Sequence, residues 1–339
     1  MKNLTILGIE TSCDETAAAI YTTSQGIISN KLFSQIEQQK MYGGVVPEIG
    51  SRTQLEKING VIDATLQAAN ITLDQIDAIA VTSKPGLAGS LLVGVCFAKA
   101  LAWCLKKPII GVNHLEGHAF SSFIEHTPPF PHICLTASGG HTSLYLVEGF
   151  GKYSTIASTT DDAAGEAFDK VAKLIGLPYP GGPEIEKMAR TVDFIDFFEY
   201  TRSKKPILEF SFSGLKTAVL YDLVKRGAYD LKSKTLIDCS LELKAQVSSS
   251  LLVAMRGIFL SKLELALKTY PNIQSVSFVG GVACNKYLKG ALNEFCTQSN
   301  LQYFTPSGQY CTDNAAMIAL VGHYMAQNNQ FSDLNLDIY

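Results

Sequence analysis

The chain repeats one structural pattern twice: a strand, a polar turn and a second strand. The first copy covers residues 4–20, and the second covers residues 132–147, where Gly139 and Gly140 supply the turn. In both copies, small hydroxyl or glycine residues at the bend allow backbone N–H groups to face an anion. Two copies of one unit in a single chain predict a duplicated architecture.

Further strands and helices alternate between and beyond these two copies. Residues 276–285 indicate a buried strand that runs into Gly280 and Gly281, followed by a helix from about residue 285 to 297. A helix N-terminus after a glycine pair suits a nucleotide phosphate. Helical spacing of apolar residues and a capping sequence predict more helices, at residues 47–69, 86–104 and 315–325. This alternation predicts the α/β class.

The length of the chain, 339 residues, is sufficient for two domains with separate cores. We expect an N-terminal lobe formed by residues 1–112 together with the C-terminal residues 314–339. The second lobe is then residues 113–313. Within it, residues from about 190 to 270 lack glycine-rich signals and predict a helical insertion.

The composition is typical of a compact globular protein, with 47% apolar and 17% charged residues. The net charge of −3 disfavours nucleic-acid binding that is driven by overall charge. Residues 202–234 nevertheless hold eight basic residues against three acidic ones. This stretch indicates either a solvated helical surface or a patch that contacts phosphates.

Cysteine usage and hydropathy favour a soluble protein. The eight cysteines have no CxxC spacing, which disfavours a zinc ribbon or a redox dithiol and suits a reducing compartment. No signal-peptide core precedes Glu10, and the longest uncharged run, residues 85–98, is too short to span a bilayer. We therefore expect a cytoplasmic protein without membrane association.

Three common motifs of α/β enzymes are incomplete in this chain. Residues 89–94 have the glycine frame of a P-loop, but Val95 replaces the lysine that binds phosphate. Thr136 stands where a nucleophile elbow around Ser138 needs glycine. No GxGxxG dinucleotide motif occurs either. P-loop NTPases, α/β-hydrolases and Rossmann dehydrogenases are therefore disfavoured.

His114 and His118 are four residues apart, which places them on one face of a helix. Two imidazoles on one face can hold a divalent metal, although such a pair is often a capping or core pair. In zinc proteases a glutamate directly follows the first histidine and acts as general base. Here Glu116 is two positions on, roughly 200° around the helix from His114. The spacing is compatible with a metal site and disfavours a zinc protease.

Two acidic segments also allow more than one interpretation. Asp313 precedes the predicted C-terminal helix, so it is either the N-cap or an oxygen ligand that completes a metal site of two histidines and one carboxylate. Asp161 or Asp162 can cap a helix that carries Glu166 and Asp169 on one face. That face is either a solvated surface or, beside the Pro/Gly turn at residues 178–183, part of a ligand-binding loop.

Together these motifs resemble the tRNA N6-adenosine threonylcarbamoyltransferase family, whose bacterial members were once called O-sialoglycoprotein endopeptidases. The matching stretches follow one another in order over nearly the whole chain: residues 8–16, 43–48, 113–118, 138–142, 161–170, 179–183, 212–217, 280–285 and 311–314. The resemblance implies the actin/hexokinase/Hsp70-like (ASKHA) fold. In that fold two duplicated α/β lobes enclose a central nucleotide cleft.

The resemblance also implies specific site residues. The metal ligands of the family match His114, His118 and Asp313, and we expect one divalent ion, with Fe2+ preferred over Zn2+ or Mg2+. The residues that hold the nucleotide match Thr136, Ala137, Ser138, Gly139, Gly140, Asp169, Gly182, Glu186 and Asn285. By motif position alone, the candidates for catalytic acid–base work are Glu10, Asp14 and His141.

One position departs from the family pattern. Thr136 stands where relatives usually carry Leu or Tyr, and in members with Tyr that side chain reaches the metal. Thr is shorter than Tyr, so we expect water or substrate, not a fourth protein ligand, in that coordination position.

The implied reaction transfers threonylcarbamoyl from threonylcarbamoyl-AMP to N6 of adenosine 37 in tRNAs that read codons beginning with A. The implied partners are tRNA, an inactive paralogue subunit (TsaB type) and a small ATPase (TsaE type). The helix at residues 47–69 is the candidate for pairing with the paralogue, although it equally suits a core-facing helix. The alternatives are a metal-dependent glycoprotease and a nucleotide-binding chaperone or kinase of the same fold.

Overall fold

The computed structural model describes residues 3–200 and 207–338. The chain forms two compact units, which we call unit 1, Met1–Thr127 with Pro306–Tyr339, and unit 2, Pro128–Thr305. Each unit contains a five-stranded mixed sheet, and the strand orders are β3-β2-β1-β4-β5 and β12-β11-β6-β7-β8. Read from the β3 and β8 edges, the two orders correspond strand for strand. The duplication predicted from the repeated pattern is therefore present in the topology.

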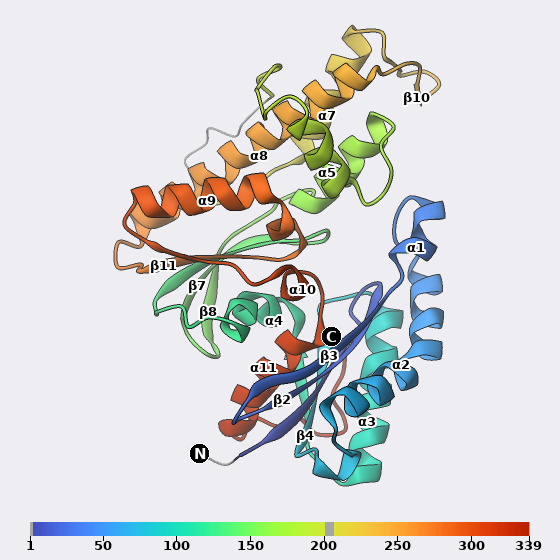
Figure 1. Cartoon of the computed structure of the whole chain (residues 1–339), viewed down its shortest axis with the longest axis vertical. Coiled ribbons are helices and arrows are strands. Elements are labelled where there is room, and N and C mark those ends of the chain that lie inside the picture. Colours follow the sequence, from blue (N-terminus) through green and yellow to red (C-terminus); the bar gives the residue numbers. More distant parts are fainter. Residues whose placement is uncertain (1–2, 201–206, 339) are drawn as a thin grey trace. The chain divides into compact units, whose positions relative to one another are not determined.

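Unit 1 is built from a β-meander followed by alternating strands and helices. Its elements are β1 (Thr5–Glu10), β2 (Glu15–Thr22), β3 (Gly26–Ser34), α1 (Ile36–Gln39), η1 (Lys40–Tyr42), α2 (Pro47–Ala69), η2 (Leu73–Gln75), β4 (Ala78–Lys84), α3 (Ala88–Leu105), β5 (Ile109–Asn113), α4 (His114–Phe120), η3 (Ser121–Ile124), α10 (Gly308–Cys311) and α11 (Ala315–Gln327). β1 pairs antiparallel with β2 and parallel with β4. Helices α2 and α3 cover one face of this sheet and α11 covers the other (Figure 1).

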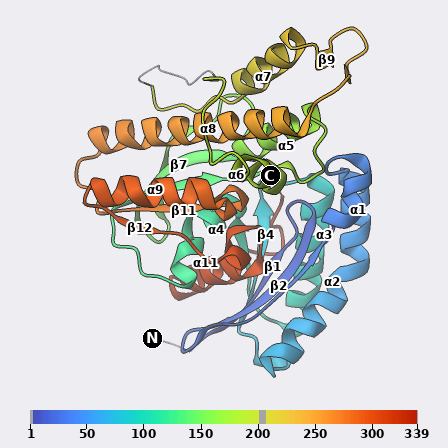
Figure 2. The same ribbon diagram turned by 45° about the horizontal axis from the view of Figure 1, so that its top comes forward.

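Unit 2 repeats this plan around its own five-stranded sheet. Its elements are β6 (His132–Ala137), β7 (Thr142–Gly149), β8 (Lys152–Ser158), α5 (Ala164–Leu174), α6 (Gly181–Arg190), α7 (Ser213–Lys225), β9 (Tyr229–Asp230), β10 (Thr235–Leu236), α8 (Leu241–Thr269), β11 (Ser275–Val279), η4 (Gly281–Cys284), α9 (Lys286–Gln298) and β12 (Gln302–Phe304). Figure 2 shows the long helix α8 beside α9. The predicted strands and helices are present, with ends shifted by a few residues.

Close contact between α11 and the sheet depends on a glycine in β1. A Cβ at Gly8 would lie 2.6 Å from the Ala315 carbonyl oxygen and 2.7 Å from the Ala319 nitrogen. Only a residue without a side chain allows the helix to approach the strand this closely. The N-terminus of α11, and Asp313 just before it, is thereby held near the C-terminal end of β1.

The boundary between the units differs from the expected one at residues 112/113 and 313/314. The structure places residues 113–127 and 306–313 in unit 1. The physical reason is packing: α4 continues directly from β5, and Gly117 lies against Met317 and Ile318 of α11. The metal-ligand candidates His114, His118 and Asp313 therefore all belong to one unit.

The region expected to be an insertion, about residues 190–270, contains α7, the short strands β9 and β10, and α8. Helix α8 contributes to the core of unit 2. The Phe259 ring packs against Phe278 of β11, with centroids 6.0 Å apart, and against Phe210 and Phe212. Burial of this aromatic cluster makes α8 an integral part of unit 2.

One described helix, α3, is long and apolar enough by length and composition to cross a bilayer. This is weak evidence for a membrane span, because core helices of soluble proteins have the same properties. In unit 1 the side chains of Leu91, Val95 and Ala98 are buried in the cluster formed with α2 and the sheet. One face of helix α3 thus packs in the core of unit 1.

The prediction that Asp161 or Asp162 caps α5 is wrong. The N-cap of α5 is Ala163, and Asp162 instead pairs with Lys170. Asp161 holds the start of another helix, α7: its carboxylate accepts the backbone N–H groups of Phe212 and Ser213 at 2.7 and 3.2 Å. Burial opposes ionisation, but these bonds and those from two serine hydroxyls hold the pKa of Asp161 below its usual value.

Substitution of Asp161 by alanine is expected to destabilise the protein. The change leaves the first N–H groups of α7 without their acceptor, so we expect the free energy of unfolding to fall by about 1–3 kcal/mol. Urea denaturation followed by circular dichroism measures this. Asp161→Asn keeps one acceptor oxygen, so its free energy of unfolding is expected to fall by less. An alanine variant as stable as the native protein would contradict this assignment.

Candidate metal and nucleotide sites

Three side chains of unit 1 converge at the N-terminus of α4. Asn113 caps this helix by accepting the Leu115 N–H at 2.8 Å, so His114 occupies the first helical turn and His118 the next. The Asp313 Oδ1 atom lies 2.9 Å from His118 Nε2 and 3.5 Å from His114 Nε2. One ligand atom from each of these three residues lies within 4.8 Å of the other two.

The donor set suits a divalent transition metal. Two imidazole nitrogens and one carboxylate oxygen are typical ligands of Fe2+ and Zn2+, and such triads leave coordination positions open. Both histidines are buried, and both direct Nε2 at the same carboxylate oxygen. Within the part of the chain that the structure describes, this is the group of three or more His, Cys, Asp or Glu side chains placed to hold an ion.

The alternative interpretation of Asp313 as the N-cap of α11 is wrong. Asn314 is the cap, because its Oδ1 accepts the Met317 N–H at 3.0 Å. The side chain of Asp313 instead reaches His118. Glu116, at the position displaced from the protease pattern, is not one of the converging side chains.

Glu10, a candidate for catalysis, lies beneath the metal-ligand cluster. It is 1% exposed at the end of β1. Its Oε2 atom contacts His114 Nδ1 at 3.0 Å and the Thr82 hydroxyl at 2.5 Å, and its Oε1 atom accepts the Ser12 N–H at 2.5 Å. Burial alone would raise the pKa of Glu10, but the charge and hydrogen bond of His114 hold it below its usual value. Thr82 belongs to no motif of the sequence, and only the pairing of β4 with β1 brings it to Glu10.

Asp14, another candidate, lies in the turn between β1 and β2 and is buried. A single side chain of α2 holds this turn: Gln54 Nε2 donates to the carbonyls of Thr11, Cys13 and Glu15. Burial and the nearby charges of Asp14 and Asp313 raise the pKa of Glu15 well above its usual value. The turn thus gathers acidic side chains close to the metal-ligand cluster.

The protonation of His114 predicts how the stability of the metal-free protein depends on pH. Burial opposes the charge, but Glu10 and Asp313 raise the pKa of His114 from 6.5 to about 9. The folded state then holds this proton more tightly than the unfolded state, so the contribution is complete below pH 6.5 and is lost as the pH rises through about 9. With chelator present, we expect the melting temperature to fall more steeply over this range than in His114→Asn. Equal slopes in calorimetry would exclude the effect.

In unit 2, the second copy of the repeated turn presents free backbone donors. Thr136 and Ala137 are buried strand residues at the end of β6, whereas Gly139 and Gly140 are exposed. The turn closes on itself through the Ser138 N–H to the His141 carbonyl at 2.8 Å. Among the described residues, no group accepts the N–H of Gly139 or Gly140. Two unused N–H groups in a glycine turn suit a phosphate oxygen.

The start of α5 lies directly against this turn. The Gly165 N–H donates to the Ser138 carbonyl at 3.0 Å, and a Cβ at Gly165 would lie 2.6 Å from that oxygen. Glycine is therefore needed at this contact. The N-terminus of a helix carries partial positive charge, which adds to the attraction of the turn for an anion.

The residues expected to hold adenosine connect α5, α6 and α9. Asp169 Oδ1 accepts the Gly181 N–H at 2.6 Å, and burial raises the pKa of Asp169. Glu186 accepts the Lys286 N–H at 3.0 Å, at the start of α9, which Asn285 caps. These residues lie together in unit 2. Gly182 lies in the first turn of α6, and a Cβ there would meet no atom within 4 Å.

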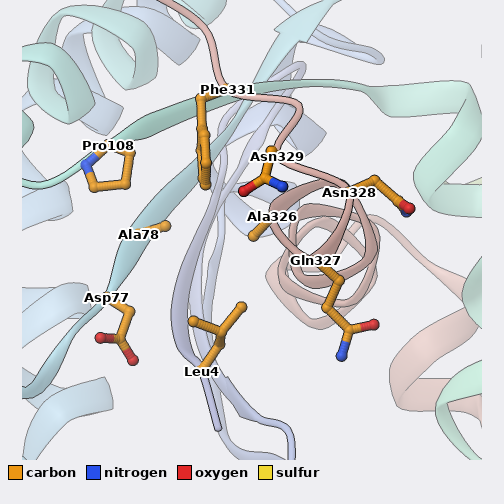
Figure 3. A pocket seen from close by; sticks show the side chains of 9 residues that line it. All are labelled: Leu4, Asp77, Ala78, Pro108, Ala326, Gln327, Asn328, Asn329 and Phe331. Atoms are coloured by element: carbon orange, nitrogen blue, oxygen red, sulfur yellow. The ribbon is translucent and has the colours of Figure 1, made fainter. Parts of the chain in front are cut away.

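A cavity of about 530 Å³ lies away from the metal-ligand cluster of unit 1 (Figure 3). It is lined by the N-terminal ends of β1 and β4 and by residues that follow α11, including Asn329 and Phe331. Its carboxylate, Asp77, is engaged with the Thr5 N–H at 2.8 Å. Ligands of such sheets bind outside the carboxyl ends of the strands, where His114 lies, so this cavity is not the candidate site.

Comparison with known proteins gives consistent matches over nearly the whole chain. Residues 26–320 match the family model described as TsaD: tRNA N6-adenosine threonylcarbamoyltransferase. A protein of that name from Geotalea uraniireducens (strain Rf4) is 46% identical over 337 residues, covering 98% of this chain and 94% of its own length. Another from Protochlamydia amoebophila (strain UWE25) is 46% identical over 331 residues, covering 97% and 94%.

Solved structures with lower identity support the fold alone. Full-length HypF in a phosphate- and nucleotide-bound form aligns with a TM-score of 0.65 and 14% identity, over 97% of this chain and 47% of that chain. Component A of the Acidaminococcus fermentans (R)-2-hydroxyglutaryl-CoA dehydratase aligns with a TM-score of 0.54 and 14% identity, over 96% and 99%. The expected fold class, the duplicated α/β fold of the actin/hexokinase/Hsp70 type, is confirmed.

Proposed function

Because this chain belongs to the tRNA N6-adenosine threonylcarbamoyltransferase family, we propose that unit 1 binds a metal ion and that unit 2 binds the nucleotide. The enzyme transfers threonylcarbamoyl from threonylcarbamoyl-AMP to N6 of adenosine 37 in tRNAs that read codons beginning with A. AMP is released. The observation that carries the proposal is the convergence of two histidines and Asp313 at 4.8 Å or less.

His114, His118 and Asp313 are proposed to hold one divalent ion, with Fe2+ preferred and Zn2+ or Mg2+ as alternatives. A metal with open positions supplies Lewis-acid polarisation of a carbonyl, which an exocyclic amine needs because it is a weak nucleophile. The two nitrogen donors disfavour Mg2+, which prefers oxygen ligands. Thr136 is too short to serve as a fourth protein ligand, so we propose that water or substrate occupies the open positions of the triad.

The nucleotide of threonylcarbamoyl-AMP is proposed to bind unit 2. The N–H groups of Gly139 and Gly140 bind the phosphate and stabilise the charge that develops on it as it leaves. Asp169, Gly182 and Glu186 hold the adenosine, and Asn285 keeps the start of α9 in place. In the transfer a C–N bond forms at N6 and the bond from the carbonyl carbon to the phosphate oxygen breaks. The electron pair departs with AMP.

The proton that N6 loses requires an acceptor. Of the three motif candidates, Glu10 is the least suitable, because it is buried and both of its oxygens are engaged. Asp14 and His141 remain proposed acid–base residues. Asp14 lies in a turn rich in carboxylates, and His141 belongs to the phosphate turn.

The test is a transfer assay with purified protein, threonylcarbamoyl-AMP and unmodified tRNA. Mass spectrometry of nuclease digests is expected to detect threonylcarbamoyladenosine that depends on both this protein and a divalent metal. A chelator should abolish the product, and added Fe2+ should restore it. Glycoprotein cleavage without tRNA modification, or nucleotide hydrolysis alone, would favour the glycoprotease or the chaperone/kinase alternative.

The proposed contacts with tRNA and partner proteins rest on the charged residues of the chain. In the basic stretch of residues 202–234, Arg202, Lys204 and Lys205 lie outside the described residues. Arg226 is engaged with Asp222 and lies over the Phe198 ring. Of the four that remain, Lys216 is half-buried, and the exposed Lys225, Lys232 and Lys234 are the candidates for phosphate contacts. Because the net charge is −3, we propose that tRNA binding needs the partner subunits, a TsaB-type paralogue and a TsaE-type ATPase, in the cytoplasm.

Helix α2 is the proposed contact for the paralogue. The apolar residues Ile58, Ile62 and Leu66 of this helix are buried in the core of unit 1. Leu55, in contrast, is 66% exposed. We expect Leu55→Glu to weaken copurification with the paralogue at least about tenfold, since a charge would be buried in an apolar contact. An intact complex in size-exclusion chromatography would contradict this. Lys57→Glu on the same helix is the control.

A further inference from the structure

Glu10 is connected to three separate groups of unit 1. It accepts the Ser12 N–H through Oε1, and through Oε2 it contacts the Thr82 hydroxyl and His114 Nδ1. The carboxylate is 1% exposed at the end of a central strand. A carboxylate with both oxygens occupied and no access to solvent is poorly placed to take a proton from a substrate.

The contact with Glu10 distinguishes the two nitrogens of His114. Nδ1 faces Glu10 Oε2 at 3.0 Å and the Ser12 hydroxyl at 3.2 Å. Nε2 faces Asp313 on the other side of the ring. An ionised carboxylate is an acceptor only, so it fixes a proton on Nδ1 and leaves the Nε2 lone pair for a metal.

The other histidine has no such support. Among the described residues, His118 Nδ1 is buried and has no hydrogen-bond partner. The cluster therefore contains one histidine whose Nδ1 contacts a carboxylate and, among the described residues, one whose Nδ1 has no partner. Glu10 is thus the carboxylate that contacts Nδ1 of a candidate metal ligand, at 3.0 Å.

We propose that Glu10 is a positioning residue, which sets the tautomer and ring orientation of His114 so that Nε2 binds the metal. The proposal rests on the metal site of the proposed function, but its tests measure metal binding and not transfer. Failure of the assay with tRNA would therefore leave it unaffected.

The variant Glu10→Gln provides the sharpest test, because its geometry predicts a reversal of polarity. The Ser12 N–H needs an acceptor, so the amide oxygen remains there and the NH2 group faces Thr82 and His114. A donor at that point places the proton on Nε2, the nitrogen that the metal needs. We expect Zn2+ to bind about 10–100-fold more weakly, measured by competition with a chromophoric chelator.

Thr82→Val is the matched control. It removes another hydrogen bond to the same oxygen of Glu10 and leaves the contact with His114. We expect its Zn2+ affinity to stay within about threefold of the native value, because the carboxylate still fixes the tautomer. Equal weakening in both variants would mean that Glu10 acts only through general packing. Native affinity in a folded Glu10→Gln protein would also overturn the proposal.

A second measurement uses the unaltered protein, so it does not depend on the folding of a variant. With 15N-labelled histidine and Zn2+ bound, long-range 1H–15N spectra report which nitrogen of His114 carries the proton. We expect Nδ1–H with Nε2 on the metal, the signal being assigned by its loss in His114→Ala. Metal bound through Nδ1 would overturn the proposal.

Discussion

Replacement of His114 by alanine is expected to remove the metal and to slow threonylcarbamoyl transfer by about 100-fold or more. Loss of one of three ligands leaves His118 and Asp313, which cannot define the site alone. Lewis-acid polarisation contributes several kcal/mol to such reactions, and each 1.4 kcal/mol corresponds to about tenfold in rate. Metal content is measured by mass spectrometry of the dialysed protein, and transfer by the assay with tRNA.

His126→Ala is the control for this prediction. His126 is an exposed histidine of unit 1 that is not part of the metal-ligand group. We expect it to keep both metal and activity. His114→Ala with full activity and no bound metal would show that the cluster is not catalytic. A variant that retains the metal but loses activity would instead indicate a direct role for the imidazole in the reaction.

Replacement of Gly280 by alanine is expected to disrupt the nucleotide site and to destabilise the protein by about 3 kcal/mol or more. Gly280 has a φ of 90°, which L-residues with a side chain rarely adopt. Its Cβ would lie 2.3 Å from the Ala137 carbonyl oxygen, directly before the turn at Ser138. Relief of this clash must move β11 away from the end of β6.

Two measurements check the effect of Gly280→Ala. Urea denaturation should give the loss of stability, and calorimetric titration with AMP should give at least about a tenfold loss of affinity, because the phosphate turn is displaced. Gly290→Ala in α9 is the control, since a Cβ there meets no neighbour. We expect that variant to be slightly more stable. Native AMP affinity in Gly280→Ala would exclude this turn as the phosphate site.

Local patterns in the sequence predicted much of the architecture. The two strand–turn–strand copies, the helices at residues 47–69 and 315–325 and the positions of His114 and His118 on one helix depend on contacts within a few residues. Period and turn chemistry act over the same short range, so a single sequence displays them. The duplicated fold follows from the repeat, and the strand orders of the two sheets agree with it.

An acidic residue that precedes a helix does not by itself identify the N-cap. Asp161 and Asp313 both precede a helix, and both have the chemistry of an N-cap. In the structure Asp161 holds α7, 51 residues further along, and Asn314 takes the cap position that Asp313 could have filled. A carboxylate beside a helix start can reach several partners, and the chain path decides which one is close.

The sequence by itself therefore determined the fold class, the repeat and the histidine pair, because these depend on patterns with a period of two to four residues. The tertiary structure decided which distant groups complete the site. His118 meets Asp313 across 195 positions, and Glu10 meets His114 across 104. Such pairs have no local signature. They exist because β1, β5 and α11 pack together, with Gly8 allowing the helix to approach the sheet.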